Sequence, residues 1–398
     1  MANNLDRFLK YVKIDTQADD NSETVPSSEK QKNLGKVLVE ELKELGLNDA
    51  HMDEYGNVYA HLNGEGRKIG LNAHMDTALE VTDTNVNPRI VKNYDGGIIN
   101  LNKDYSMSPE SFPSLKKHIG HDLVVTDGTT LLGADDKAGI AIIMSAVAFF
   151  TSHPEVKHHN ISVCFTCDEE IGRGPAHFDI NKMDAEFAYT IDGASINAVD
   201  YENFNAKHAL IEVEGVSVHP GEGRGKLINS LLVLKDVLNQ LNEKETPYYA
   251  DEDHGYWHLN EIKGSGEYSY ASMILRAFEE DEMNNRLDEL NYAVKNSSLK
   301  YPNSKISLKI KDEYSNMKQY VVNRPEVIEL ANKAIIKNGL KPEHYKVRGG
   351  TDGATFSKMG LPTPNLGTGS YNHHGRYEYL DVQEFEQMIN IVIDILKI

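Results

Sequence analysis

Short apolar runs alternate along the chain with segments that have the character of helices. The runs at 69–74, 161–165 and 188–191 are apolar almost throughout, which is typical of strands buried on both faces of a parallel sheet. The segment from 136 to 150 is apolar on nearly every side and predicts a buried helix. This alternation indicates an α/β fold: a mixed, mostly parallel sheet with helices on both faces.

Polar residues mark the boundaries in the first third of the chain. A capping-box pattern at Ser28 and Gln31 predicts the start of a helix that ends at Gly46. The stretch from 80 to 120 is rich in Asn, Asp, Gly and Pro, and it predicts a long loop with a hairpin around residues 95–97. The regular elements of this part are therefore expected on either side of a long irregular segment.

A different order of elements begins near residue 205. The expected elements are a strand at 209–214, a helix at 227–241, strands at 257–263 and 271–278, a helix at 280–294 and a strand at 305–311. This β-α-β-β-α-β order is typical of a self-contained split βαβ domain of about a hundred residues. The α/β pattern then resumes and closes with a capped helix at 381–396. We therefore expect residues 205–312 to be a domain inserted into a discontinuous one made of 1–204 and 313–398.

The charge of the chain limits its partners. Its 398 residues carry a net charge of −20, which argues against nucleic acid and anionic membrane surfaces as partners. No apolar stretch has the length of a membrane span, and the N-terminus lacks the apolar core of a signal peptide. We therefore expect a cytoplasmic protein that can concentrate cations in an acidic cleft.

The two cysteines, Cys164 and Cys167, have the C-x-x-C spacing of redox-active and zinc-binding motifs. Residues three apart on a strand, however, point to opposite faces of the sheet. We therefore expect both cysteines to be inert core residues.

Three consecutive carboxylates, Asp168, Glu169 and Glu170, follow the apolar run at 161–165. An isolated acidic triplet usually lies in a solvated loop. At the end of a buried strand, three such charges repel one another and destabilise the fold unless cations neutralise them. The triplet therefore indicates a cation site if other ligands gather beside it.

Other apolar runs also end in histidine or acidic residues: His74 and Asp76, Asp135 and Asp136, and Asp192. Open α/β sheets bind ligands outside the carboxyl ends of their strands, where these side chains would meet. His74 and Asp76 project from one face of a strand, so that Asp76 can orient a histidine ligand. Asp135 is placed to bridge two cations, and a last ligand is expected within residues 371–376.

Glu169 and Glu170 are adjacent on an extended chain and do not easily reach the same cation. One of them can bind the cation while the other faces the position where water binds. A carboxylate beside such a water can take its proton, so the residues predict metal-assisted hydrolysis. Zn²⁺, Co²⁺ and Mn²⁺ all suit a site with mixed nitrogen and oxygen ligands.

Seven different short motifs are spread along the full chain in a characteristic order and spacing. They are Asn72–Thr77, Leu132–Gly139, Asp168–Gly174, Ile191–Gly193, Val218–Gly221, Arg348–Gly353 and Asn372–Arg376. In order and spacing they resemble the peptidase T family of tripeptide aminopeptidases, which belongs to the dizinc superfamily of aminoacylases and glutamate carboxypeptidases.

The resemblance implies a centre with two Zn²⁺ ions, with Co²⁺ or Mn²⁺ as alternatives. His74 and Asp192 would hold one ion, and Glu170 and His374 would hold the other. Asp135 would bridge the two ions, and the peptide bond that follows it is expected to be cis.

The resemblance also implies the catalytic and substrate-binding groups. Asp76 would support the histidine ligand, and Glu169 would be the general base. The inserted domain would be a lid, in which His219 stabilises the oxyanion and Arg276 contacts the substrate carboxylate. Short peptides are the expected substrates, and the chain is expected to be a monomer or a homodimer formed through the lid.

Two segments of the inserted domain, 222–226 and 264–269, differ from the family pattern and leave the peptide preference open. A non-catalytic, metal-dependent peptide-binding protein is an alternative from another class; it would keep the ligands and lose the base, whereas Glu169 is present. An amidohydrolase or carboxypeptidase that acts on N-acyl or other peptide substrates is the alternative among hydrolases.

Overall fold

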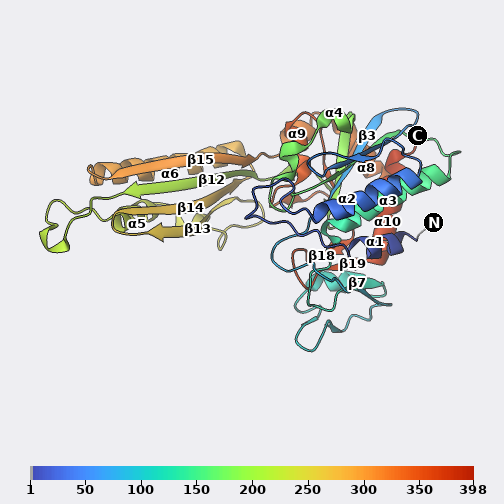
Figure 1. Cartoon of the computed structure of the whole chain (residues 1–398), viewed down its shortest axis with the longest axis horizontal. Coiled ribbons are helices and arrows are strands. Elements are labelled where there is room, and N and C mark those ends of the chain that lie inside the picture. The colour runs from blue at the N-terminus through green and yellow to red at the C-terminus, as the bar shows by residue number, and fades with distance from the viewer. Residues whose placement is uncertain (1–2) are drawn as a thin grey trace. The chain divides into compact units, whose positions relative to one another are not determined.

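The computed structural model describes residues 3–398, and these form two compact units (Figure 1). The first unit contains the described residues up to Tyr201, together with Met317–Tyr345 and Thr351–Ile398. The second unit contains Glu202–Asn316 and Lys346–Gly350. Within residues 3–398, no helix combines the length and the apolar character needed to cross a membrane.

The first unit is built on a sheet with the strand order β1-β2-β8-β3-β9-β17-β10. These strands are β1 (His51–Met52), β2 (Val58–Leu62), β8 (Asn160–Thr166), β3 (Lys68–His74), β9 (Phe187–Gly193), β17 (Asn365–Gly367) and β10 (Val199–Asp200). The central strands β8, β3, β9 and β17 are parallel, and the pairings toward both edges are antiparallel. The predicted mixed sheet is thus confirmed, and its central strands are apolar because both of their faces are buried.

Helices cover both faces of this sheet (Figure 1). On one face lie α1 (Asn4–Tyr11), α2 (Gln31–Glu44), α3 (Ala134–Ser152), α8 (Pro325–Lys337) and α10 (Val382–Leu396). The other face packs against η2 (Gly174–His177), α4 (Ile180–Met183) and α9 (Asp352–Lys358), and the short helix α7 (Lys318–Val321) lies beside α8 and α9. Cys164 and Cys167 are free thiols in the cores of opposite faces, which confirms that they are packing residues.

A smaller sheet of the first unit has the order β18-β19-β7-β4. Its strands are β18 (Ser370–Tyr371), β19 (Tyr379–Asp381), β7 (Leu123–Val125) and β4 (Arg89–Val91), and η1 (Pro113–His118) precedes β7. The loop between β18 and β19 carries His374, and the chain after β7 leads to Asp135. This sheet therefore supports two of the predicted ligands.

The hairpin predicted around residues 95–97 is wrong. The hairpin of this region joins β5 (Ile99–Asn100) to β6 (Ser106–Met107). Tyr94 instead pairs through its backbone with Gly120 and His121, and the Asp95 side chain accepts a hydrogen bond from the Gly97 amide. The side chain of Asp95 thus shapes a local turn without strand pairing.

The predicted capping box at Ser28 and Gln31 is also wrong, although the helix is present. α2 begins at Gln31 without a side-chain cap. The side chain of Gln31 instead donates a hydrogen bond from Nε2 to Asp168 Oδ1 at 2.6 Å. The side chain of Gln31, which the local pattern assigned to the end of the helix, thus binds a residue far away in the sequence.

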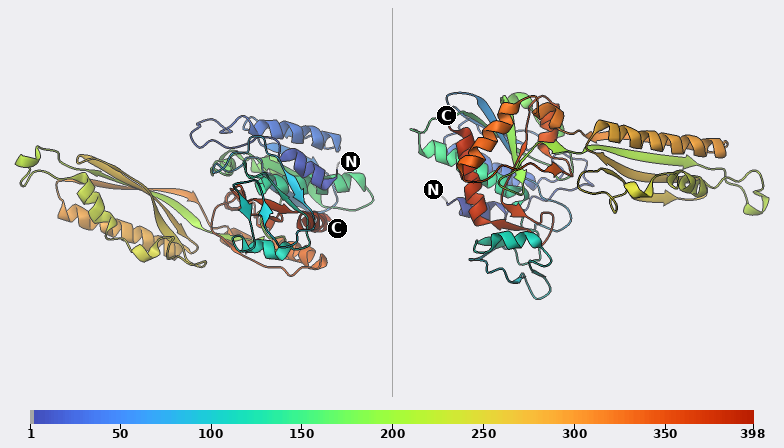
Figure 2. Two further views of the ribbon diagram at one scale, coloured as in Figure 1. Left: turned by 90° about the horizontal axis from the view of Figure 1, so that it is seen from below. Right: turned by 180° about the vertical axis from the view of Figure 1, so that it is seen from behind.

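The second unit contains a sheet of order β13-β14-β12-β15, with antiparallel pairing throughout. Its elements are β12 (Asn205–Glu214), η3 (Pro220–Glu222), α5 (Ser230–Leu238), η4 (Glu243–Glu245), β13 (Tyr256–Gly264), β14 (Tyr268–Ala277), α6 (Glu280–Lys300) and β15 (Lys305–Tyr314). Both α5 and α6 pack on one face of this sheet (Figure 2). Alternate residues of β14 are buried against these helices. The order of elements, β-α-β-β-α-β, is the one predicted for a split βαβ domain.

Residues 346–350 belong to the second unit, whereas the sequence placed them in the first domain. The strand β16 (Lys346–Val347) pairs in parallel with β11 (Glu202–Asn203). The Arg348 guanidinium lies 5.1 Å from the ring centre of Phe204 and donates to the backbone oxygen of His254. Residues 346–350 are thus held in the second unit by partners that are distant in sequence, namely β11, Phe204 and His254.

Candidate metal centre

Three parallel strands bring predicted site residues to one edge of the sheet. His74 ends β3, Glu169 and Glu170 follow β8, and Asp192 lies near the end of β9. Because β8, β3 and β9 are neighbours, their carboxyl ends meet. Asp135 is different: residues 126–133 form no strand in the described chain, and Asp135 lies at the start of α3.

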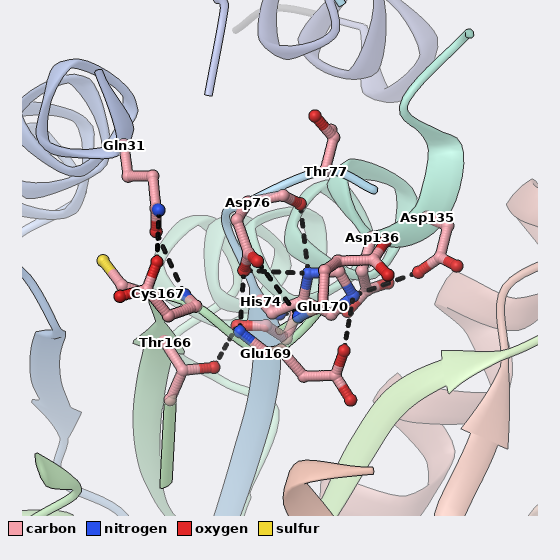
Figure 3. Close-up of polar contacts among 12 residues, drawn as sticks. Gln31, His74, Asp76, Thr77, Asp135, Asp136, Thr166, Cys167, Glu169 and Glu170 are labelled. Carbon is pink, nitrogen blue, oxygen red and sulfur yellow. Dashed lines mark hydrogen bonds and ion pairs between the residues drawn. The ribbon is translucent and has the colours of Figure 1, made fainter. Parts of the chain in front are cut away.

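His74 lies at the middle of the site and is almost fully buried (Figure 3). Its Nε2 atom is 3.0 Å from Asp135 Oδ1, 3.5 Å from Asp192 Oδ1 and 3.9 Å from Glu169 Oε2. The Nδ1 atom on the other side of the ring is 3.1 Å from the Asp76 backbone oxygen. That contact places the proton on Nδ1 and leaves the Nε2 lone pair for a ligand.

His374 makes a second group with the other carboxylate oxygen of Asp135. Its Nε2 atom is 3.1 Å from Glu170 Oε2 and 3.4 Å from Asp135 Oδ2. The neighbouring His373 also faces Asp135, at 3.5 Å, but its Nε2 atom is hydrogen-bonded to Ser370 Oγ at 2.8 Å. Of the two histidines, His374 is therefore the one that contacts both carboxylates.

The spacing of these donor atoms suits shared cations. Two atoms that each lie about 2.0–2.1 Å from a tetrahedral Zn²⁺ ion are about 3.3 Å apart. The separations around His74 and His374 lie close to this value, and each group uses a different oxygen of Asp135. Glu170 Oε1 is buried without a hydrogen-bond partner in the described chain, which is expected of an atom that can bind a cation. The residues present therefore fit two cations.

The peptide bond between Asp135 and Asp136 is cis, as predicted. Asp136, which the sequence left without a role, is fully buried beside the centre. Its Oδ2 atom accepts from the His74 amide at 3.1 Å, and its Oδ1 atom accepts from the Gly139 amide at 3.2 Å. Asp136 therefore joins the end of β3 to the start of α3.

Asp76 connects the histidine to the acidic turn. Its Oδ1 atom lies 3.4 Å from His74 Nδ1, so the contact predicted from their spacing is present. The same carboxylate accepts hydrogen bonds from the backbone amides of Glu169 and Glu170, both at 3.0 Å. One side chain thus fixes both the histidine ring and the turn that carries the two glutamates.

Asp168 does not face the cation site, although the sequence treated the three carboxylates together. Its carboxylate accepts from the Ser27 amide, the Ser27 hydroxyl and the Gln31 side chain, at 2.6–2.7 Å. Its backbone has a φ of 60°, an uncommon value for a residue other than glycine. These bonds satisfy the Asp168 carboxylate and hold the turn that directs Glu169 and Glu170 toward the centre.

Burial and mutual repulsion shift the acid–base behaviour of the centre. Burial raises the pKa of Glu170 to about 11, with a contribution from the charge of Asp135. Burial also raises the pKa of Asp192 to about 6 and that of Glu169 well above its usual range. In His74 the nearby carboxylates, Asp192 foremost, outweigh burial and raise the pKa of the ring. The centre without cations therefore holds protons that bound cations would displace.

Cation affinity is consequently expected to increase with pH. Glu170 has a raised pKa and is protonated at neutral pH, so binding through its carboxylate must release that proton. The apparent affinity should increase about tenfold per pH unit for each proton released, between about pH 6 and 8. Calorimetric titration in buffers of different ionisation heats measures the affinity and the proton count together. An affinity that stays constant across this range would contradict the expectation.

A separate cluster of His118, His121 and Asp381 has donor atoms close enough to suggest a metal site. Both Nδ1 atoms point to Asp381 Oδ2, at 2.8 and 2.6 Å, which are hydrogen-bond lengths. The other oxygen of Asp381 accepts from the Glu384 amide and caps α10. The cluster thus fastens the turn before β7 to the start of α10.

The second unit carries the two predicted substrate-binding residues. His219 is exposed, and its Nδ1 atom accepts from the Gly221 amide at 3.2 Å, so that Nε2 carries the proton of the neutral ring. Arg276 lies on the face of β14 opposite the helices and forms an ion pair with Glu313 at 2.9 Å. A guanidinium has five N–H donors, so this pair leaves donors for a second carboxylate.

Comparisons with known proteins agree with the fold and the site. A sequence model of the family described as peptidase family M20/M25/M40 matches residues 123–398. Peptidase T from Clostridium perfringens is 45% identical over 397 residues, which cover 99% of this chain and 98% of that protein. Peptidase T from Desulfitobacterium hafniense is 45% identical over 404 residues, with 100% and 98% covered.

Solved structures share the whole fold at lower identity. The aminopeptidase PepT from Bacillus cereus has a TM-score of 0.78 at 20% identity, with 99% of this chain and 97% of that chain covered. A tripeptidase from Staphylococcus aureus has a TM-score of 0.77 at 20% identity, with the same coverage.

Histidine and carboxylate side chains gather at the carboxyl edge of the sheet, and the family model matches most of the chain. Together with the full-length relatives, this defines the chain as a hydrolytic metallo-exopeptidase. With full-length relatives at 45% identity, the chain belongs to the peptidase T family within peptidase family M20/M25/M40. The resemblance read from the motifs of the sequence is thus confirmed.

Proposed function

We propose that the protein is a dizinc aminopeptidase that releases the N-terminal residue of tripeptides. The observation that carries this proposal is the position of Asp135, whose two oxygens each lie beside a different histidine. His74 and Asp192 would complete one cation site, and Glu170 and His374 the other. Membership of the peptidase T family supports peptides as the substrate class.

The chemistry divides between the cations and the protein. A bound pair of divalent cations would supply Lewis-acid chemistry, because it makes water easier to deprotonate near neutral pH and polarises the peptide carbonyl. Glu169 takes the proton of the attacking water and passes it to the leaving amine. Its Oε2 atom lies 3.9 Å from His74 Nε2, at the margin of the ligand set, which suits a base better than a ligand.

The second unit would act as a lid over the peptide. His219 would donate its Nε2–H to the developing oxyanion, and Arg276 would bind the C-terminal carboxylate. These roles, a homodimer formed through this unit and a cytoplasmic location are parts of the proposal.

Activity assays with the purified protein test the proposal. The protein reconstituted with Zn²⁺, Co²⁺ or Mn²⁺ is expected to cleave Ala-Ala-Ala and to release its first residue. Dipeptides, N-blocked tripeptides and N-acyl amino acids are the comparison substrates. Preferred hydrolysis of N-acyl amino acids would favour an amidohydrolase, and peptide binding without turnover would favour a binding protein.

Arg276→Ala is expected to raise KM for free-acid tripeptides by about tenfold or more, the loss typical of one charge-assisted hydrogen bond. C-terminally amidated tripeptides should be affected much less, because they lack the carboxylate. Side-by-side kinetics with the two peptide types measure the difference. Equal losses on both would mean that Arg276 does not read the carboxylate.

A further inference from the structure

A buried carboxylate that belongs to no ligand set connects the two loops that hold the second cation site. Glu378 lies between the His374 loop and β19, and 1% of it is exposed. Its Oε2 atom accepts from the amides of Leu132 and Gly133 at 2.8 and 2.7 Å. Its Oε1 atom accepts from the Asp135 amide at 2.9 Å.

These hydrogen bonds determine the path of the chain into α3. The turn before Asp135 has no strand neighbour among the described residues, and Gly133 has a φ of 74°, which favours glycine. Asp135 and Asp136 lie within the bounds of α3 but have non-helical φ and ψ angles, so this turn precedes the regular helix and needs hydrogen-bond acceptors from elsewhere in the fold. Glu378 supplies the acceptors that this turn needs, and it thereby fixes the backbone of Asp135.

The other side of Glu378 is tied to His374. The Glu378 amide donates to the Gly375 backbone oxygen at 3.2 Å, and the Asn372 side chain donates to the Tyr377 backbone oxygen at 3.1 Å. The loop that presents His374 is therefore closed by hydrogen bonds of its own and is joined to Glu378 through the backbone. The Arg376 guanidinium adds a hydrogen bond to the Gly128 backbone oxygen at 3.0 Å.

We infer that Glu378 is a positioning residue that sets the separation of Asp135 Oδ2 and His374 Nε2, and through it the affinity for the second cation. The inference rests on the proposed dinuclear function. Glu378 is no ligand itself, because three backbone amides occupy its oxygens. It acts by holding two ligands from different loops at the 3.4 Å separation that a shared cation requires.

Glu378→Gln tests this role, since the amide keeps the size but turns an N–H group toward the backbone donors. Stepwise Co²⁺ titration, followed by visible absorption, is expected to show an affinity for the second ion about 10–100-fold below that of the wild type. The first ion should be affected less, because His74 and Asp192 lie on the main sheet. Excess Co²⁺ should restore much of kcat, which a general loss of folded protein would not allow.

Asp381→Asn is the matched control. Asp381, at the end of β19, is also a buried carboxylate that accepts a backbone hydrogen bond, but its partners are His118, His121 and Glu384. This variant should lower Tm and leave both Co²⁺ affinities unchanged. An equal loss of the second ion in Asp381→Asn would overturn the inference, as would wild-type Co²⁺ binding in Glu378→Gln.

Two further results separate the possible failures. If Glu378→Gln does not fold, Glu378→Asp decides the question, because it keeps the charge but cannot reach both groups of donors. Wild-type affinity for both ions in that variant would overturn the inference, and a weakened second ion would support it. A wild-type chain that binds a single Co²⁺ ion would overturn the dinuclear function and this inference together.

Discussion

Glu169→Gln is expected to retain both cations and to lower kcat by about 100–10,000-fold, the range typical of a lost general base. The amide has the size of the carboxylate but cannot accept the proton of the attacking water. The backbone of residue 169 should stay in place, because its hydrogen bond to Asp76 comes from the main-chain amide. Metal analysis together with steady-state kinetics on tripeptides measures both quantities.

The neighbouring Glu170→Gln is the matched control for this prediction. Glu170 lies 3.1 Å from His374 and carries the buried oxygen that lacks a hydrogen-bond partner in the described chain, so its loss should weaken cation binding. The two variants should therefore separate: one keeps metal without turnover, and the other loses metal. Near-normal turnover in Glu169→Gln, or metal loss in that variant, would exclude Glu169 as the base.

The sequence predicted the parts of the centre that depend on regular local rules. The gathering of candidate ligands at the ends of β3, β8 and β9 follows from apolar runs that stop at polar residues, because neighbouring parallel strands end at one edge. The insertion of the split βαβ unit followed from a change in the order of elements. The family resemblance then ordered the predicted ligands into two groups, and the distances around Asp135 are compatible with this grouping, which stays a prediction.

The remaining features depend on contacts between residues far apart in the chain. Ser27 and Asp168 are hydrogen-bonded although 141 positions separate them, and no local pattern distinguishes Asp168 from the two glutamates that follow it. In the sequence Glu378 looks like an ordinary acidic residue between two tyrosines, yet its partners are the amides of the Asp135 turn. Residues 346–350 were misplaced for the same reason, since their short strand pairs with Glu202–Asn203.

These distant contacts also explain why a cluster of like charges is compatible with folding. Asp168 and Asp76 are stabilised by hydrogen bonds, since Asp168 accepts from Ser27 and Asp76 accepts from two backbone amides. Of the carboxylates that remain beside the histidines, Glu169, Glu170 and Asp192 have raised pKa values, whereas the pKa of Asp135 is lowered. The fold thus supplies hydrogen-bond donors to the carboxylates that position the centre. The other carboxylates remain available to bind cations or protons.

Asp135→Ala is expected to remove both cations, the largest loss of metal from one substitution in this chain. Burial of Asp135 opposes the charged form of its carboxyl. The nearby His373, His374 and His74 outweigh burial and lower the pKa of this carboxyl well below its usual range. Asp135 is therefore ionised where its neighbours hold protons, and each oxygen serves one histidine group. Alanine removes both donors at once, and metal analysis after dialysis should find neither ion.

Asp135→Asn refines this test, because an amide keeps one oxygen donor and loses the other. It should retain about one cation per chain, bound more weakly than in the wild type, since a neutral oxygen attracts a cation less than a carboxylate does. Thermal unfolding of both variants checks that the fold persists. Two tightly bound cations in Asp135→Ala would show that the groups around His74 and His374 bind independently, and the bridging role of Asp135 would then be wrong.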